Sequence, residues 1–210
     1  MTSATPPPAS VDDVSAAVTS RLDEVGLALV EAADRLLAQE GPAGLTVRRI
    51  ATEAGVSTMN VYSRFGGKDG VVEQLFLQGF GLLAARMGEI ETTDDPLADL
   101  TLCGQAYRRF ALEHATLYAV MFERVVADYE PSPHAVEAAL GTLGQLADRL
   151  QRAMDAGLLQ RMDPLHAAAI VWSTCHGAVS LQLKHAAEAP VDWDQVFTDA
   201  ATAVVRGLSA

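Results

Sequence analysis

Side chains that could bind a nucleic acid gather in one stretch of the chain, residues 45–75. Within 46–68 there are four basic residues and one acidic residue, Glu53, so the local charge is +3, whereas the whole chain carries −12 and the remainder −15. The basic residues are Arg48, Arg49, Arg64 and Lys68. An acidic protein is repelled by phosphate unless it concentrates positive charge at the contact. This charge distribution favours DNA binding by this stretch.

Two short helices and a tight turn are predicted to position these side chains. Apolar residues at i, i+3, i+4 and i+7 predict the first helix: Val47, Ile50, Ala51 and Ala54. Thr46 can cap its start, and Gly55 can reverse the chain after it. Ser57 can cap the second helix, on which Val61 and Phe65 face inward. This is the plan of a helix-turn-helix, whose second helix enters the major groove; a plain helical hairpin is the alternative.

This stretch resembles the N-terminal domain of the TetR family of transcriptional repressors. The matching residues are Thr46, Ile50, Ala51, Ala54 to Ser57, Val61, Tyr62, Phe65, Lys68 and Asp69, with Val25 to Gly41 as the preceding helix. Three positions depart from the family pattern. Thr58 replaces a frequent glycine and Arg64 a common histidine, and both bear on the operator sequence rather than the fold. Gly70 stands where a better helix former is usual.

The resemblance implies two kinds of DNA contact. Thr46, Tyr62 and Lys68 would touch phosphates, and Thr58, Met59, Asn60 and Ser63 would face base edges. Hydroxyl and amide groups can hydrogen-bond to bases, and a methionine can meet a thymine methyl group. The full candidate DNA-binding set is Thr46, Arg48, Arg49, Ser57, Thr58, Met59, Asn60, Tyr62, Ser63, Arg64 and Lys68.

The rest of the chain is predicted to be helical as well, giving an all-α fold of about nine helices. Helix-start signals occur at Asp95-Pro96, Ser132-Pro133, Asp163-Pro164 and Asp192, with a softer break near 113–116. The predicted domains are a disordered tail (1–17), a helix-turn-helix DNA-binding domain (18–67), and a helical ligand-binding and dimerisation domain (68–210). A connector helix from about Lys68 to Met87 carries several glycines, which either allow close helix packing or make that helix easy to shift.

Dimerisation is one expected task of the larger domain, because helix-turn-helix proteins usually grip two half-sites about 34–36 Å apart. The last two helices, 165–185 and 193–208, are apolar on more than one face and rich in alanine. We expect them to form a four-helix interface between two copies. Burial in the core of a single copy is the alternative.

A pocket for a small effector is the other expected task. Trp172 and His176 share a helical stripe, and the Trp172-x-x-x-His176-Gly177 element resembles the signature of one TetR subgroup. Such a stripe also describes an ordinary core. The candidate ligand-binding residues are Phe80, Tyr107, Phe110, Tyr118, Met121, Phe122, Met154, Trp172 and His176.

Other classes of function find little support in the sequence. Catalytic motifs and closely spaced metal ligands are missing, so we expect no enzyme activity, no cofactor and no metal. Cys103 and Cys175 are expected to be reduced core residues, with a redox pair as the alternative. No apolar run is long enough to span a membrane, and the first ten residues lack a secretory signal.

The sequence therefore predicts a cytoplasmic regulator, nucleoid-associated when bound to DNA, most simply a dimeric repressor released from a palindromic operator by a small, partly apolar ligand. The alternative is a helical ligand-binding or metabolic protein that does not act on DNA.

Overall fold

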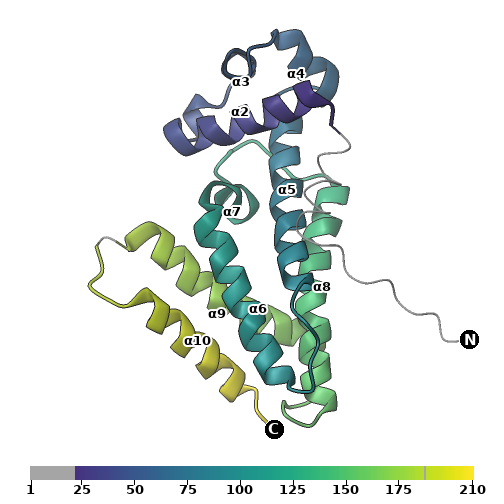
Figure 1. Cartoon of the computed structure of the whole chain (residues 1–210), viewed down its shortest axis with the longest axis vertical. Helices are drawn as coiled ribbons and strands as arrows, with labels where there is room; N and C mark the ends of the chain where they lie inside the picture. Colours follow the sequence, from purple (N-terminus) through teal and green to yellow (C-terminus); the bar gives the residue numbers. More distant parts are fainter. Residues whose placement is uncertain (1–21, 187) are drawn as a thin grey trace, which may run out of the picture. The chain divides into compact units, whose positions relative to one another are not determined.

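Helices make up the regular structure of residues 22–186 and 188–210, which the computed structural model describes (Figure 1). They are α2 (Glu24–Glu40), η1 (Pro42–Gly44, a 3-10 turn), α3 (Val47–Glu53), α4 (Thr58–Phe65), α5 (Lys68–Gly88), α6 (Pro96–Glu113), α7 (Ala115–Phe122), α8 (Pro133–Asp155), α9 (Pro164–His185) and α10 (Trp193–Gly207). These residues contain no strand, only an isolated bridge between Leu159 and Ser209. The predicted all-α class with about nine helices is therefore confirmed for them. The predicted tail, 1–17, lies outside the described residues.

The predicted start signals coincide with the observed helix starts. Proline is the first residue of α6, α8 and α9, where its missing N–H costs no hydrogen bond. The Asp163 side chain accepts a hydrogen bond from the His166 backbone N–H at 2.8 Å. Asp192 likewise accepts from the backbone N–H groups of Asp194 and Gln195, at 3.0 and 3.2 Å. Local capping chemistry therefore sets these boundaries.

The described chain divides into two compact units. The first comprises the residues up to Ala85 together with His114–Ala139, and the second comprises Arg86–Glu113 and Leu140–Ala210. Helices α5 and α8 each contribute to both units. The predicted domain bounds, 18–67 and 68–210, stay a prediction.

The first unit holds the helix-turn-helix segment, in which α2, α3 and α4 pack on one another (Figure 1). Leu29 of α2, Ile50 of α3 and Val61 of α4 are fully buried there. The N-terminal part of α5 adds Val72 and Leu75, which are also fully buried. The apolar periodicity that predicted α3 and α4 thus corresponds to the buried faces of these helices.

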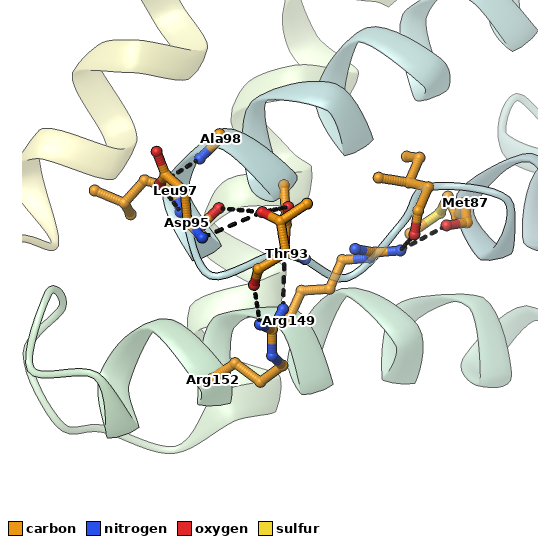
Figure 2. Close-up of polar contacts among 9 residues, drawn as sticks. Met87, Thr93, Asp95, Leu97, Ala98, Arg149 and Arg152 are labelled. Carbon is orange, nitrogen blue, oxygen red and sulfur yellow. Dashed lines mark hydrogen bonds and ion pairs between the residues drawn. The ribbon is translucent and has the colours of Figure 1, made fainter. Parts of the chain in front are cut away.

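In the second unit, polar contacts hold the chain between α5 and α6 against α8 (Figure 2). Arg149 Nη2 donates to the carbonyl oxygens of Met87 and Ile90, at 2.8 and 2.9 Å. Arg152 donates to the Thr93 carbonyl oxygen at 2.7 Å and to the buried Asp99 carboxylate at 2.9 Å. Two arginines one turn apart on α8 therefore fix the end of α5 and the start of α6.

Helices α9 and α10 pack side by side in the second unit, and both contact α6 (Figure 1). Arg108 of α6 connects them, because its Nε donates to Gln182 Oε1 at 2.9 Å and its Nη1 forms an ion pair with Asp194. Phe197 is buried and lies under the Arg108 guanidinium, 5.7 Å from it to the ring centroid. These contacts set the position of the last two helices on α6.

Candidate DNA-binding site

Local hydrogen bonds hold the two helices of the candidate site in place. Thr46 Oγ1 accepts a hydrogen bond from the Arg49 backbone N–H at 3.3 Å and so caps α3, as predicted. Gly55 has φ +70°, a left-handed conformation that glycine adopts without strain, and Val56 N–H bonds back to the Ala51 carbonyl oxygen at 2.9 Å. Ser57 stands at the N-cap of α4 without a side-chain capping bond. The chain therefore reverses tightly between α3 and α4.

Helix α4 presents an exposed face that combines apolar and hydroxyl groups. Met59 is 70% exposed and Tyr62 is 55% exposed. Thr58 and Ser63 are exposed as well. Four of the five residues that the resemblance assigns to bases and phosphates on this helix are thus open to a partner, and the fifth, Asn60, is half-buried.

The predicted basic residues differ in how their charges are compensated. Arg49 forms an ion pair with Glu40, and Arg64 forms one with Asp23. Lys68 lies 4.0 Å from Asp69, at the limit of an ion pair. Arg48 is exposed and has no ion-pair partner among the described residues. The local sum of +3 therefore overstates the positive charge that is free at this surface.

Sequence reasoning missed the acidic partners of these arginines. Asp23 caps α2 by accepting from the Gly26 backbone N–H at 2.8 Å, so helix-cap rules could have found its local role. Its second partner, Arg64, lies 41 residues further along the chain. Nothing in the local pattern indicates such a contact.

The residues predicted to line a ligand pocket fall into two groups. Phe80, Tyr118, Met121 and Phe122 belong to the first unit. The Phe80 and Phe122 ring centroids lie 5.4 Å apart, those of Tyr118 and Phe122 lie 4.9 Å apart, and Tyr118 is fully buried. These residues form an aromatic cluster, which is the arrangement of a packed core as much as of a pocket.

The other five residues belong to the second unit: Tyr107, Phe110, Met154, Trp172 and His176. The Tyr107 hydroxyl lies 3.2 Å from His176 Nδ1, and the Trp172 and His176 rings lie 5.5 Å apart. His176 thus has a polar partner inside the helical unit, as the core interpretation of this histidine requires. That all nine residues form one pocket stays a prediction.

The two cysteines are free thiols buried in the second unit. Burial raises the pKa of the Cys103 thiol and of the Cys175 thiol, each to about 11. A thiol reacts as its thiolate, so both groups are poor nucleophiles at neutral pH. The structure thus places both thiols where the expectation of reduced core residues requires them.

Neither a metal cluster nor a membrane span is found in the described residues. No three His, Cys, Asp or Glu side chains in 22–186 and 188–210 are grouped so that they could hold a metal ion. No helix in these ranges is both long and apolar enough to cross a membrane.

A helix-turn-helix with an exposed second helix and basic flanks defines a DNA-binding protein. Comparison with known proteins agrees, because residues 29–75 match the bacterial regulatory proteins of the tetR family. Residues 100–204 match the tetracyclin repressor-like C-terminal domain. The chain belongs to the TetR family of transcriptional regulators.

Individual relatives support this assignment. The chain is 26% identical over 183 residues to the uncharacterized HTH-type transcriptional regulator Rv0681 of Mycobacterium tuberculosis (strain ATCC 25618 / H37Rv), a match that covers 86% of this chain and 79% of the relative. A protein of unknown function from Rhodococcus sp. RHA1 has a similar structure, with a TM-score of 0.78, 26% identity, and coverage of 90% and 97%. The fold also resembles the TetR family regulator PfmR from Thermus thermophilus, with a TM-score of 0.68, 20% identity, and coverage of 90% and 100%.

These findings confirm the predicted DNA-binding transcriptional regulator and disfavour the alternative of a helical protein that does not act on DNA. The Trp-His-Gly subgroup, inferred from Trp172, His176 and Gly177, stays a prediction.

Proposed function

We propose that this regulator is a homodimeric repressor that binds a palindromic operator and leaves it when a small, partly apolar ligand binds. The exposed face of α4 is the observation that carries the proposal. Thr58 and Ser63 would hydrogen-bond to base edges there, and Met59 would meet a thymine methyl group. Such a regulator would work in the cytoplasm, where the chromosome lies.

Contacts to phosphate would come from residues on and beside α4. Tyr62 is exposed on α4, Thr46 lies exposed at the start of α3, and Lys68 begins α5. Arg48 would be the strongest of these contacts, because its charge is exposed and has no ion-pair partner among the described residues. Contacts of this kind fix the register of the protein on DNA without reading its sequence.

The surface of the last two helices supports the proposed dimer. On α9, the small or apolar residues Ala169, Ile170, Ser173, Gly177 and Leu181 follow one another at helical spacing and are partly or fully exposed. On α10, Val196, Ala200 and Ala203 do the same. Side chains of this size allow helices of two copies to pack closely, as in a four-helix interface.

Salt dependence of operator binding tests the proposed DNA contacts. Genomic fragments retained by the protein would be sequenced, and the affinity for the enriched sequence measured from low to high salt. Each phosphate contact contributes about 0.9 to the slope of log K against log salt. Arg48→Ala should therefore reduce the slope by about 0.9 and weaken binding to all sequences alike.

Arg161→Ala is the matched control, because it removes the same charge from an exposed residue between α8 and α9. It should leave the slope unchanged. Equal slopes for the Arg48 and Arg161 variants would contradict the assigned contact, and an absence of any enriched sequence would contradict operator binding.

A further inference from the structure

A continuous series of hydrogen bonds runs from the start of α4 to the start of α2. Asn60 Nδ2 donates to Ser57 Oγ at 3.1 Å, and Arg64 Nη1 donates to Asn60 Oδ1 at 2.8 Å. Arg64 Nε donates to Asp23 Oδ1 at 2.9 Å, and Arg64 Nη2 donates to Asp23 Oδ2 at 2.6 Å. Asp23 Oδ1 also accepts the hydrogen bond from Gly26 that caps α2. One guanidinium thus connects two helices of the first unit.

Three residues of this series, the N-cap Ser57 and the α4 residues Asn60 and Arg64, occupy one face of the helix. Ser57, Asn60 and Arg64 are spaced i, i+3 and i+7, which places them in a row. At 100° per residue, Tyr62 points about 160° away from Arg64. The series therefore lies on the side of α4 that contacts α2, where Ser57 and Arg64 are exposed and Asn60 is half-buried.

The charge of Arg64 is compensated within this series. Its planar guanidinium meets the Asp23 carboxylate in two parallel hydrogen bonds, a geometry that lysine cannot reproduce. The hydrogen bonds from Arg64 lower the pKa of Asp23 to about 2, so the carboxylate is charged at neutral pH. Contact between Arg64 and a DNA phosphate would require this pair to separate.

We propose that Arg64 is a positioning residue, which holds the Asn60 carboxamide in one orientation and α4 against α2, and not a phosphate contact. Both ends of the carboxamide have protein partners, so its orientation is set before DNA arrives. Such preorganisation reduces the cost of ordering side chains on binding. Arg64 would then influence which sequence is preferred without contributing to the salt dependence. This inference rests on the proposed contacts of α4 with bases.

The test compares the salt slope and the base preference of the same variants. Base preference would be measured by competition between the operator and copies with single base-pair changes. Arg64→Ala should leave the slope unchanged, weaken binding by up to about fivefold, the size expected for an exposed ion pair, and reduce discrimination between bases. Arg48→Ala should do the opposite, with a slope reduced by about 0.9 and discrimination intact.

Two conservative variants separate charge from geometry. Arg64→Lys keeps the charge but not the planar fork, so discrimination should fall as in Arg64→Ala. Asp23→Asn keeps an oxygen for the α2 cap, because asparagine caps as well as aspartate, but it removes the countercharge. Its effect on discrimination should not add to that of Arg64→Ala, because the two residues act through one contact.

Two results would overturn the positioning role. One is a slope that falls by about 0.9 in Arg64→Ala, which would make Arg64 a phosphate contact. The other is full discrimination in Arg64→Lys, which would show that charge alone suffices. A wild-type protein whose DNA binding ignores salt would overturn the proposed DNA contacts too, so the two failures are distinguishable.

Discussion

The backbone of Gly70 passes close to the end of α4, the second helix of the helix-turn-helix. A Cβ at this position would lie 2.8 Å from the carbonyl carbon of Phe65 and 3.1 Å from its Cα. Both are backbone atoms, which cannot move aside as a side chain can. Between Phe65 and Gly70 the chain turns through Gly66, whose φ of +72° is left-handed. The departure of Gly70 from the family pattern therefore has a steric cause.

Gly70→Ala should destabilise the protein, because the new methyl group overlaps the backbone at the junction of α4 and α5. Overpacking of this kind typically costs about 1–3 kcal/mol. The measurement is the free energy of unfolding in denaturant. Gly141→Ala on α8 is the control, since its Cβ would meet nothing within 4 Å. It should stabilise by about 0.5–1 kcal/mol, as alanine does in a helix interior, and equal effects of the two variants would contradict the steric argument.

Thiol reactivity gives a second prediction at the scale of single residues. The pKa of each cysteine is raised from 9.0 to about 11, so the thiolate fraction near neutral pH falls about a hundredfold. Labelling of Cys103 and Cys175 by a thiol reagent should therefore be slow in the native protein and fast in denaturant. Rapid labelling of the native protein, or loss of operator binding after mild oxidation, would instead support the redox pair.

At the scale of helices, local signals were enough to predict where most elements begin. Proline after Asp95, Ser132 or Asp163 marks a first turn by chemistry that involves only neighbouring residues. Contacts between distant residues were not predictable in this way. Asp99 and Arg152 are 53 residues apart, and no pattern in either segment predicts that these two residues form a contact. The contacts that hold the α5–α6 connection on α8 therefore came only from the structure.

The Asp99 carboxylate should make stability depend on pH. Hydrogen bonds from Thr93 and Arg152 lower its pKa from 3.8 to about 2. A carboxylate with a lowered pKa stabilises the folded state above its unfolded pKa, and this contribution is lost as the pH falls through the folded value. The free energy of unfolding should therefore decrease between about pH 4 and pH 2, as measured in denaturant across this range.

Asp99→Asn should weaken the protein at neutral pH and flatten this acid dependence, because the amide carries no charge to lose. Asp155→Asn is the matched control on α8, where Asp155 is exposed and pairs with Arg161 at 3.4 Å. Exposed pairs contribute little, so this variant should keep the wild-type profile. An unchanged acid dependence in Asp99→Asn would assign the effect to other carboxylates.

At the scale of the whole molecule, family membership and the all-α fold class could be predicted from the sequence, whereas the ligand could not. The helix-turn-helix signature is short and local. A pocket, by contrast, depends on how separate helices converge. Four of the nine predicted pocket residues belong to one compact unit and five to the other, and stripes on single helices cannot reveal such a division.

Dimerisation is the property of the whole molecule on which the proposed repressor depends. A single copy has one helix α4 to place in the major groove, and two half-sites on one face of DNA lie about 34–36 Å apart. Two copies are therefore needed to occupy both half-sites. Leu181 on α9 is 53% exposed, on the surface proposed to meet the second copy. Leu181→Glu would place a charge in an interface without a partner, which is strongly unfavourable when water is excluded.

Leu181→Glu should therefore convert the dimer to a monomer in sedimentation and lower operator affinity, with the helical content unchanged. The control is Leu140→Glu on α8, where the leucine is 61% exposed and lies outside the proposed interface. It introduces the same charge and should preserve both the dimer and its affinity. If Leu140→Glu dissociated the dimer and Leu181→Glu did not, α8 rather than α9 would form the interface. A wild-type monomer that binds the full palindrome as tightly as a half-site would contradict the dimeric repressor itself.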